Sequence, residues 1–496
     1  MPDQPAEVEV IVVGGGAAGC VVAARLSENA SRSVLLLEAG PDLRRNVPAH
    51  LRDGWGLSRE IDDWGFATEP DERGEVKPLR RGKLLGGTSW LTRFAVRGSQ
   101  ADFDAWAALG NAGWSFDEVL PYFRKLEADA DFGDKPWHGA DGPIPIRRYG
   151  ELEQTDILGA AGRALEAAGF PLVRDHNQPG AVGTGRMPMS STAGARVTTV
   201  DAYLPLGGTP SNLTIRPNAE VAEVVSEGVR ATGVRLVDGT VLRASCVVLS
   251  AGTYGSPAIL MRSGIGPADH LRSVGVRVRQ DLPGVGANLA DHPAVDIDTG
   301  YRGPATDATI LHSITTFHTA DASSDGPPDL MLWLCDPVGD PPFPFEVVLL
   351  KPHSRGTVRL RSEDPRDPPR IELPNLREAA DVDRVAEGCR RLMEVARRPE
   401  IRRLCADQAS PDLRGVDEQR RFVRENAYSV PHVVGTCAMG TQPGEGAVVD
   451  TFGRVYGTEG LFVIDASIMP DPPSGFPHIV TIMIAERLSE QIESIV

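Results

Sequence analysis

The chain is poor in lysine and in long apolar runs, and each shortage excludes a class of protein. Its 496 residues contain only five lysines, and 68 acidic residues outnumber 51 basic ones, which gives a formal charge of −17. This balance argues against binding to nucleic acid or to an anionic membrane surface. No apolar run approaches the 18 residues of a spanning helix, and the N-terminal stretch has no basic and apolar signal-peptide pattern.

Cysteines are also few, and none is paired in sequence. No CxxC pattern occurs, and most of the cysteines lie in apolar stretches, which predicts reduced, buried thiols rather than disulfides or a metal site. We therefore expect no metal and a cytoplasmic location. The six are Cys20, Cys246, Cys335, Cys389, Cys405 and Cys437.

A glycine-rich turn separates two apolar segments near the N-terminus. Val8–Val13 predicts a buried strand, and Ala17–Leu26 predicts a helix. Gly14-x-Gly16-x-x-Gly19 lies between them. The first glycine permits a tight turn, the second lets the backbone approach a pyrophosphate, and the third lets the helix pack on the strand. The helix N-terminus then offers N–H groups and a positive dipole end to phosphates.

A second strand and an acidic residue complete this pattern. Ser33–Leu37 predicts the strand, and Glu38 follows it, where a carboxylate can bind ribose hydroxyls. A carboxylate there repels a 2′-phosphate, which disfavours NADP and leaves NAD and FAD. No clean second βαβαβ half follows, and this favours FAD.

Further strands and helices are spread along the chain. If the later strands flank the first two in one sheet, the cofactor domain is discontinuous, with another domain inserted between its pieces. The helices that we expect are Ala379–Arg398 and Ile479–Ile492. The strands that we expect are two within Asn212–Val225, a hairpin at Gly233–Leu242 that turns at Asp238–Gly239, then Cys246–Ser250 and Leu461–Ile464.

Several long motifs, in order over nearly the whole chain, resemble the glucose–methanol–choline (GMC) family of FAD-dependent oxidoreductases. They are VVGGGAAGCVVAARLSE at 12–28, RGKLLGGTS at 81–89, RGSQADFDAWAALGNAGWSFDEVLPYFRKLE at 97–127, LSAGTYGSPAILMRSGIGP at 249–267, DLPGVGANLADH at 281–292, PHSRGTVRL at 352–360, and the C-terminal HVVGTCAMG and VIDASIMP.

The resemblance implies an α/β fold with a discontinuous, Rossmann-like FAD-binding domain. An interleaved α+β substrate domain is implied beside it, built on a mostly antiparallel sheet. We expect residues 1–45, 78–98, 210–300 and 440–496 in the FAD-binding domain. We expect residues 46–77, 99–209 and 301–439 in the substrate-binding domain.

The resemblance also implies where FAD binds. Glu38 would bind the adenosine ribose, Val221 would lie beside the adenine, and Lys83–Ser89 would wrap the pyrophosphate and the flavin edge. The full set implied as cofactor-binding is Gly14, Gly16, Ala17, Ala18, Gly19, Glu38, Ala39, Lys83, Gly86, Gly87, Thr88, Ser89, Thr92, Val221, Ala251, Gly252, Asp465, Ala466, His478 and Ile479.

Two histidines are implied as the catalytic pair. His432 occupies the position of the family's base in HxxGTxxMG, and His478 precedes the last helix, where the family has a second histidine or an asparagine. Imidazole suits the removal of a hydroxyl proton while a hydride leaves the carbon for flavin N5. The remaining histidines carry no such signal, and His292, which follows Asp291 in a family motif, is expected to be structural.

The chain departs from the family after GGTS. Family members have a flavin-facing asparagine there, or a histidine linked covalently to the flavin. This chain has Trp90–Phe94, where Thr92 is the candidate for the asparagine position and Leu91 for the position of covalent attachment. Neither can form the histidyl bond, so noncovalent FAD is expected.

We expect a small alcohol as substrate, with oxygen or another electron acceptor reoxidising the flavin. Aromatic residues at Phe317, Trp333, Phe343 and Phe345 suggest a pocket wall for an uncharged, apolar or aromatic alcohol, although such aromatics are also typical of a core. No acidic and aromatic pattern is specific enough to indicate a choline-like cation. Two alternatives stay open, a lyase of the hydroxynitrile lyase type and a flavin-binding protein with a degenerate pocket.

Overall fold

The computed structural model describes most of the chain. Its described residues are 7–52, 61–71, 74–150, 154–192, 195–301, 303, 312–336, 345–373, 376–405, 413 and 415–493.

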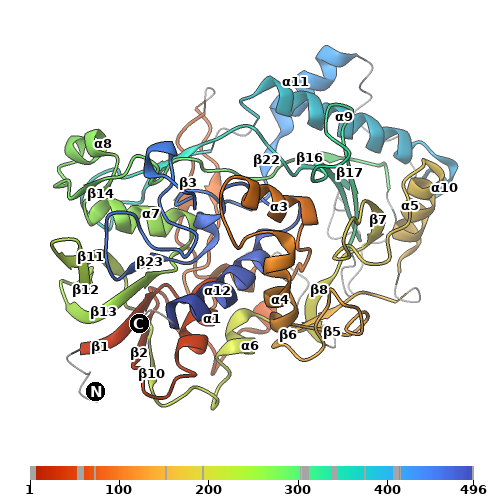
Figure 1. The fold of residues 1–496 in the computed structure, drawn as a ribbon. Coiled ribbons are helices and arrows are strands. Elements are labelled where there is room, and N and C mark those ends of the chain that lie inside the picture. Colours follow the sequence, from red (N-terminus) through yellow and green to blue (C-terminus); the bar gives the residue numbers. More distant parts are fainter. Residues whose placement is uncertain are drawn as a thin grey trace.

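A seven-stranded sheet forms the first half of the architecture (Figure 1). Its order is β10-β2-β1-β13-β12-β11, with β23 also paired to β13. The strands are β1 (Glu7–Val13), β2 (Val34–Leu37), β10 (Leu213–Arg216), β11 (Val221–Glu227), β12 (Arg230–Leu236), β13 (Val241–Leu249) and β23 (Leu461–Val463).

The central strands of this sheet are parallel, so their carboxyl ends meet at one edge. Gly14 follows β1, Glu38 follows β2, Ser250 follows β13 and Ile464 follows β23. Four segments far apart in sequence are thereby brought together where α/β sheets bind ligands.

One strand is longer than the sequence pattern indicates. Val241–Leu249 is continuous, although Gly233–Leu242 and Cys246–Ser250 were expected as a hairpin and a separate strand. Its first half pairs with the antiparallel β12, and its second half pairs with the parallel β23. The first half is partly exposed and the second fully buried, so the change in hydropathy along it reflects a change of environment within one strand.

Two helices from opposite ends of the chain pack together beside this sheet. α1 (Ala17–Leu26) has the predicted bounds, and α12 (Pro477–Glu493) packs against it and against α4 (Phe116–Leu126). In Figure 1, α12 runs between α1 and α4 near the centre of the molecule. The helix begins two residues before the predicted Ile479, because proline, with its fixed φ, suits the first helical position.

A six-stranded sheet forms the second half, in the order β22-β16-β19-β18-β17-β7. All its pairings are antiparallel. The strands are β7 (Gly183–Arg186), β16 (Pro293–Ile297), β17 (His312–Phe317), β18 (Leu330–Cys335), β19 (Phe345–Leu349) and β22 (Tyr428–Ser429).

Helix α9 (Ala379–Ala396) covers one face of the six-stranded sheet. Gly388 permits this close approach, because a Cβ there would lie 2.4 Å from Cγ1 of Val347. Val347 therefore faces α9, and by strand alternation Glu346 faces the opposite side. Figure 1 shows α9 and α11 (Val416–Asn426) at the end of the molecule away from β11–β13.

Shorter elements fill the space between and around the two sheets. The strands are β3 (Phe66–Ala67), β4 (Pro78–Leu79), β5 (Glu127–Asp129), β6 (Ile144–Arg147), β8 (Met189–Thr192), β9 (Ala195–Arg196), β14 (Ile265–Gly266), β15 (Gln280–Asp281), β20 (Thr357–Arg359) and β21 (Arg370–Glu372). The helices are α2 (Ala49–Arg52), α3 (Gln100–Ala108), α5 (Asp156–Ala167), α6 (Thr199–Tyr203), α7 (Gly252–Arg262), α8 (Ala268–Ser273) and α10 (Pro399–Arg402).

The predicted fold class is confirmed, with a largely parallel sheet beside a separate antiparallel one. The predicted domain boundaries stay a prediction. One strand bears on them, because β16 lies within 210–300 and yet pairs in the six-stranded sheet. Among the described residues, no helix has the length and hydropathy needed to cross a membrane.

Candidate active site

A cavity of about 1080 Å³ lies between the two sheets and is lined by residues of both. Its walls include the turn after β1, the segment around Lys83, the N-terminus of α7, the region of Asp465, and one face of the six-stranded sheet. This volume exceeds the 300–1,000 Å³ typical of pockets for drug-sized ligands. The cavity has room for a dinucleotide and a small second molecule.

The glycine turn borders the cavity, and its three glycines do different work. Gly14 has a φ of +96°, which favours glycine. A Cβ at Gly16 would meet no atom within 4 Å, so this backbone is open to a ligand. A Cβ at Gly19 would lie 1.8 Å from the Gly14 carbonyl oxygen. Gly19 therefore lets the helix pack on the turn, and it is not among the residues that line the cavity, so its predicted contact with the cofactor stays a prediction.

Glu38 lies at the predicted place, at the cavity edge after β2. Its carboxylate accepts hydrogen bonds from the backbone N–H groups of Gly15 and Gly40, both at 2.8 Å. Burial raises the pKa of Glu38, and these backbone donors oppose the shift. The carboxylate thus fixes the glycine turn while it lines the cavity.

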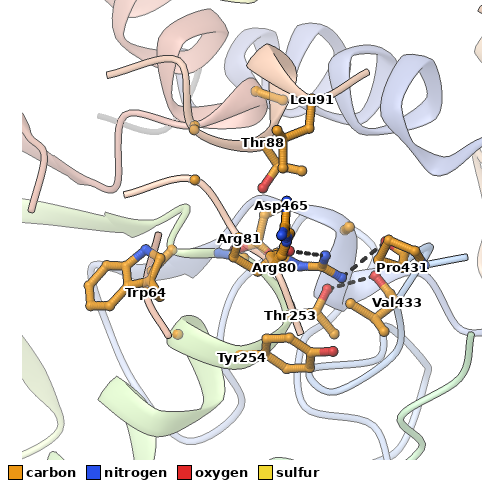
Figure 2. A pocket seen from close by; sticks show the side chains of 18 of the residues that line it. Trp64, Arg80, Arg81, Thr88, Leu91, Thr253, Tyr254, Pro431, Val433 and Asp465 are labelled. Carbon is orange, nitrogen blue, oxygen red and sulfur yellow. Dashed lines mark hydrogen bonds between the residues drawn. The ribbon is translucent and has the colours of Figure 1, made fainter. Parts of the chain in front are cut away.

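The segment from Lys83 to Ser89 forms the facing wall. Lys83 donates to Glu220 at 2.9 Å, and Ser89 donates to the Gly86 carbonyl. Figure 2 shows the Thr88 hydroxyl turned into the cavity. Gly86 lies behind this wall, because a Cβ there would be 2.5 Å from Nε1 of Trp90, so it shapes the loop without lining the cavity.

Asp465 joins two segments at the far side of the glycine turn. It accepts hydrogen bonds from the Gly252 backbone at 2.9 Å and from the Ser256 hydroxyl at 2.6 Å. Burial raises the pKa of Asp465, against the hydrogen bonds that hold it. Asp465 and Ala466 line the cavity, whereas the buried Ile479 of α12 is not among its lining residues.

These walls fit FAD. The helix N-terminus of α1 begins at Gly16 with no side-chain cap, so its backbone donors are available to phosphate oxygens. Thr88, the open backbone of Gly16 and the cations of Lys83 and Arg262 line the same cavity. The donor set is therefore the one that a pyrophosphate and a flavin carbonyl require.

His432 lies on the loop after β22 and borders the same cavity. Its backbone N–H donates to Asp291 at 2.6 Å, and the next carbonyl, of Val433, accepts from Thr253 at 2.9 Å. Arg81 donates to the Pro431 carbonyl at 3.0 Å. Figure 2 shows Arg81 and Thr253 reaching this loop from the cavity side. Three elements therefore fix the position of the imidazole.

A second histidine touches the His432 ring. Nδ1 of His292 lies 3.1 Å from Nδ1 of His432, and His292 is fully buried. Burial, with His292 and Arg81 adding to it, holds the pKa of His432 well below its usual value. His292 was expected to be only structural; the structure places it against the candidate base.

His478 is the second residue of α12 and lines the cavity with His432. The two histidines are 46 positions apart in sequence, so the fold brings the predicted pair to one site. Burial, and secondarily the charge of Arg196, lowers the pKa of His478 to about 4. Both imidazoles are therefore neutral at pH 7.

Aromatic rings form the wall of the cavity on the side of the six-stranded sheet. Phe476 lies 4.8 Å from His432 and 5.2 Å from Trp333, measured between ring centroids. Phe94 contacts Trp333 at 5.0 Å, and the Trp333 indole donates to His312 at 3.1 Å. These five residues all line the cavity.

Of the predicted aromatics that the structure describes, Trp333 lines the cavity, and Phe317 and Phe345 do not. Phe317 packs against Phe170 at 5.4 Å and not against the cavity. Phe345 shares the face of Val347, toward α9, so it belongs to the core. Phe343 lies outside the described residues.

Leu91 and Thr92, the positions at which the chain departs from the family, both line the cavity. Thr92 Oγ1 accepts a weak hydrogen bond from the Phe94 backbone at 3.4 Å. Sequence reasoning missed Phe94, Phe476, His312 and His292. Only the last had a signal, its place beside Asp291 in a family motif, because the others depend on which side of a strand or loop faces the cavity.

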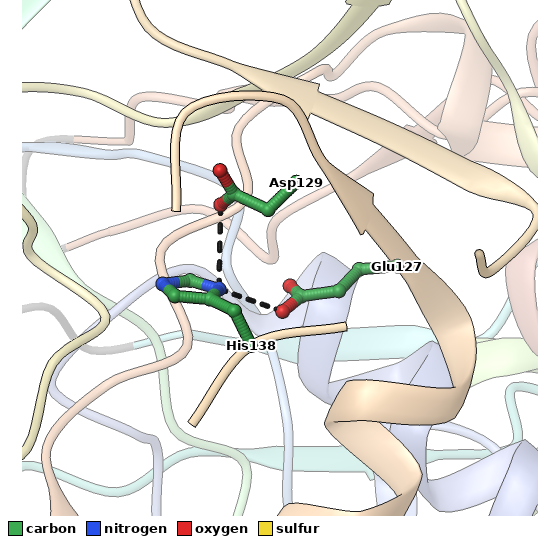
Figure 3. Close-up of side chains that lie close together, drawn as sticks. All are labelled: Glu127, Asp129 and His138. Atoms are coloured by element: carbon green, nitrogen blue, oxygen red, sulfur yellow. Dashed lines mark hydrogen bonds and ion pairs between the residues drawn. The ribbon is translucent and has the colours of Figure 1, made fainter. Parts of the chain in front are cut away.

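A separate buried cluster could be mistaken for a metal site. Figure 3 shows Nδ1 of His138 between Glu127, at 2.7 Å, and Asp129, at 3.3 Å. Asp175 accepts from Nε2 at 2.9 Å. Two buried arginines complete the cluster, Arg97 beside Glu127 and Arg148 bridging Asp129 and Asp175. Because three carboxylates face two arginines, one proton on His138 balances the charge, and we interpret the cluster as an ion-pair network.

Comparison with known proteins agrees with the motifs and with this geometry. Two models, both described as GMC oxidoreductase, match residues 8–294 and 352–485. The chain belongs to the GMC oxidoreductase family. It is therefore an FAD-dependent oxidoreductase, as predicted.

Relatives of known activity are similar over their whole length. A 5-(hydroxymethyl)furfural oxidase of Methylovorus sp. (strain MP688) is 36% identical, with 98% of each chain covered. An oxygen-dependent choline dehydrogenase of Yersinia pestis bv. Antiqua (strain Antiqua) is 33% identical, over 98% of this chain and 94% of that one. The crystal structure of a pyridoxine 4-oxidase from Mesorbium loti aligns with a TM-score of 0.91 at 30% identity, covering 98% and 99%.

Proposed function

We propose that this GMC oxidoreductase oxidises a small alcohol to an aldehyde or ketone, with His432 as the base. The observation that carries the proposal is the convergence of His432, His478 and the dinucleotide loops on one cavity. FAD, when bound, supplies the acceptor for the hydride. The three relatives named above are, by their names, a 5-(hydroxymethyl)furfural oxidase, an oxygen-dependent choline dehydrogenase and a pyridoxine 4-oxidase. Each of the compounds so named carries an alcohol group, which supports the same reaction class.

His432 is suited to accept the hydroxyl proton. Its lowered pKa keeps the imidazole unprotonated at neutral pH, and a base must begin in that form. Nδ1 is engaged with His292, so we assign Nε2 as the nitrogen that meets the substrate. The backbone bond to Asp291 limits motion of the ring relative to the cavity.

His478 is suited to hold the substrate oxygen. It borders the cavity from the first turn of α12, and His432 lines the same cavity. A neutral imidazole there can hydrogen-bond the oxygen, and the N-terminal end of the helix adds positive potential where negative charge develops. The rings of Phe94, Trp333 and Phe476 support a substrate with an aromatic or apolar body.

Stopped-flow reduction of the flavin under anaerobic conditions tests the roles of the two histidines. The alcohols are 5-(hydroxymethyl)furfural, benzyl alcohol, choline and pyridoxine. His432→Ala should retain FAD and slow reduction about 10²–10⁴-fold at saturating alcohol, because a placed base contributes that much. His478→Asn should slow it less, since an amide can still hydrogen-bond the oxygen.

The exposed His50→Ala is the matched control and should reduce at the wild-type rate. A wild-type rate in His432→Ala with a dead His478→Asn would reverse the two roles. A yellow enzyme that no alcohol bleaches, but that cleaves a cyanohydrin, would replace oxidation with lyase chemistry.

We further propose that FAD is held without a covalent bond. Leu91 and Thr92 occupy the segment where a histidyl link would form, and neither side chain can make it. Acid precipitation should therefore leave all of the flavin in the supernatant. The visible absorbance of the flavin in the supernatant and in the redissolved pellet gives the measurement. Flavin that remains with the pelleted polypeptide would contradict this.

A further inference from the structure

Two carboxyl groups face the cavity from the six-stranded sheet, and the reaction proposed above does not use them. Asp296 is on β16 and Glu346 on the neighbouring β19, directly paired across the ladder. Directly opposed residues have Cβ atoms about 4.5–5.5 Å apart and share one face of the sheet. Both residues line the cavity.

The same row continues into the aromatic wall. Trp333 on β18 is paired with Glu346, so indole and carboxyl are neighbours on the cavity face. Tyr428 on β22, at the other side, donates its hydroxyl hydrogen to Asp296 at 2.6 Å. Two carboxyls are thus flanked by two aromatic side chains.

No cation of the described chain neutralises this pair. Within the described residues, neither carboxyl forms an ion pair with lysine, arginine or histidine at 4.0 Å or less, whereas the other buried carboxylate network, around His138, is matched by two arginines. The titratable groups that face Glu346 are Asp296, Tyr428 and the Cys335 thiol. Arg93, which also lines the cavity, acts on His312 instead.

Because no cation neutralises the two carboxyls, ionising both of them in the free protein is unfavourable. Glu346 is 4% exposed, and burial, with Asp296 adding to it, raises the pKa of Glu346 well above its usual value. Asp296 is more exposed than Glu346, lines the cavity, and still has its pKa raised by burial, against the hydrogen bond from Tyr428. A cation between the two carboxyls would relieve their repulsion.

A row of aromatic side chains connects the pair to the candidate base. Phe476 is the ring between His432 and Trp333, and Trp333 is the neighbour of Glu346. An alcohol whose hydroxyl is at His432 would lay its body along Phe476 and Trp333. Its far end would then reach the carboxyls.

We infer that Asp296 and Glu346 form a subsite for a cationic nitrogen at the end of the substrate remote from its hydroxyl. The inference rests on the proposed alcohol oxidation and names its substrate class, an aryl alcohol with a basic nitrogen substituent. Adjacent aromatic rings favour a cation further, because their faces attract positive charge. This class differs from the uncharged substrate that the sequence suggested.

Two alcohols of nearly equal shape test the subsite. 4-(Aminomethyl)benzyl alcohol carries an ammonium group at pH 7, and 4-ethylbenzyl alcohol carries a methyl group in the same place. In anaerobic stopped-flow experiments on the holoenzyme, the apparent second-order rate constant for flavin reduction should be at least about tenfold higher for the ammonium alcohol. Glu346→Gln and Asp296→Asn should each lower that preference about tenfold or more.

The controls separate charge from fold. Both variants should keep their FAD and their rates with 4-ethylbenzyl alcohol, and Asp269→Asn, which removes an exposed charge elsewhere, should change nothing. A readout that needs no turnover is the binding of benzylamine to the holoenzyme by calorimetry. It should weaken about tenfold in Glu346→Gln and Asp296→Asn only.

The outcomes are distinct for the two proposals. If 4-ethylbenzyl alcohol is preferred by the wild type, or if the variants leave benzylamine binding and the ammonium preference unchanged, the subsite is overturned. If neither alcohol bleaches the flavin although benzylamine binds through both carboxyls, the subsite stands and the proposed oxidation fails.

Discussion

At the residue scale, the contact between His292 and His432 decides which imidazole nitrogen meets the cavity. In a neutral imidazole one nitrogen donates and the other accepts, and the partner of one nitrogen sets the role of the other. We propose that Nδ1 of His432 donates to Nδ1 of His292, 3.1 Å away, which leaves Nε2 of His432 as the acceptor for a substrate proton.

Replacing His292 tests this tautomer argument. His292→Leu keeps a bulky side chain but removes the acceptor, and a misplaced base should slow flavin reduction by alcohol about 10²-fold at saturating substrate. His292→Asn, whose amide oxygen can take the place of Nδ1, should keep most of the rate. The measurement is the stopped-flow rate of flavin reduction in the wild type and both variants, from about pH 5 to about pH 9.

A merely structural role for His292 would show a different pattern. Both variants would then lower Tm together, while the rate at saturating alcohol and its pH profile stayed those of the wild type. Such a result would return His292 to the role that its sequence context suggested.

Other residues show why a sequence reaches only part of a site. The glycines and Glu38 were predictable, because a turn and its neighbours depend on local spacing. Local spacing does not reveal which side chains of a strand face the cavity, because a shift of one residue along the strand moves every side chain to the other face. Phe345 and Glu346 are adjacent, yet the first packs toward α9 and the second lines the cavity. The aromatic signal therefore selected the wrong neighbour.

At the element scale, the network around His138 ties together segments that no strand pairing joins. Glu127 and Asp129 are on β5, Asp175 is on a later loop, and Arg97 precedes α3. Burial alone would lower the pKa of His138, but hydrogen bonds to Asp175 and Glu127 outweigh it and the pKa is raised. The folded protein therefore binds this proton more tightly than the unfolded chain does.

The consequence is a stability that declines at alkaline pH. A raised folded pKa means that the contribution is complete below the unfolded value of about 6.5 and is lost as pH rises through the folded value. His138→Gln should lower the free energy of unfolding by about 3–5 kcal/mol at pH 6, the cost of breaking a buried ion pair. The difference from wild type should shrink at alkaline pH.

The measurement is the free energy of unfolding in urea at pH values from about 6 to the alkaline side. A change at the exposed His50, His50→Gln, is the control. A difference between wild type and His138→Gln that does not change with pH would contradict a protonated His138. A wild-type Tm that falls on treatment with EDTA would show that a metal ion, and not a proton, balances the carboxylates.

The predicted bounds of an element agree with the structure where the whole element lies in one kind of environment. α1 has the predicted bounds, and it is buried along most of its length between the seven-stranded sheet and α12. β13 was divided into a hairpin arm and a buried strand, because it pairs with β12 at its exposed end and β23 at its buried end. Tertiary pairing, which local patterns do not contain, joins the two halves.

At the scale of the whole molecule, the cavity is the place where the two sheets share walls. The turn after β1 and the indole of Trp333 both line it, so a dinucleotide and its substrate together contact both halves of the architecture. A ligand that binds only the folded chain stabilises it by mass action, by about 2.7 kcal/mol at 100 times its Kd. FAD should therefore raise the Tm of the entire protein.

Two glycine substitutions separate this ligand effect from the stability of the fold. A Cβ at position 16 would meet no atom within 4 Å, so we expect Gly16→Val to melt near the wild-type temperature when FAD is absent. The same side chain fills the place of the pyrophosphate, so the variant should not retain FAD or gain Tm when FAD is added. Gly19→Val instead forces a Cβ to within 1.8 Å of the Gly14 carbonyl and should destabilise the protein with or without FAD.

Differential scanning calorimetry, with flavin content measured in parallel, distinguishes the two variants. A side chain at position 16 would occupy the open space that we assign to the ligand. A side chain at position 19 would collide with the Gly14 carbonyl of the chain itself. A Gly16→Val variant that retains FAD and its Tm gain would mean that the phosphates lie elsewhere in the cavity. The assignment of the glycine turn to the dinucleotide would then be wrong, even though the fold that positions it stands.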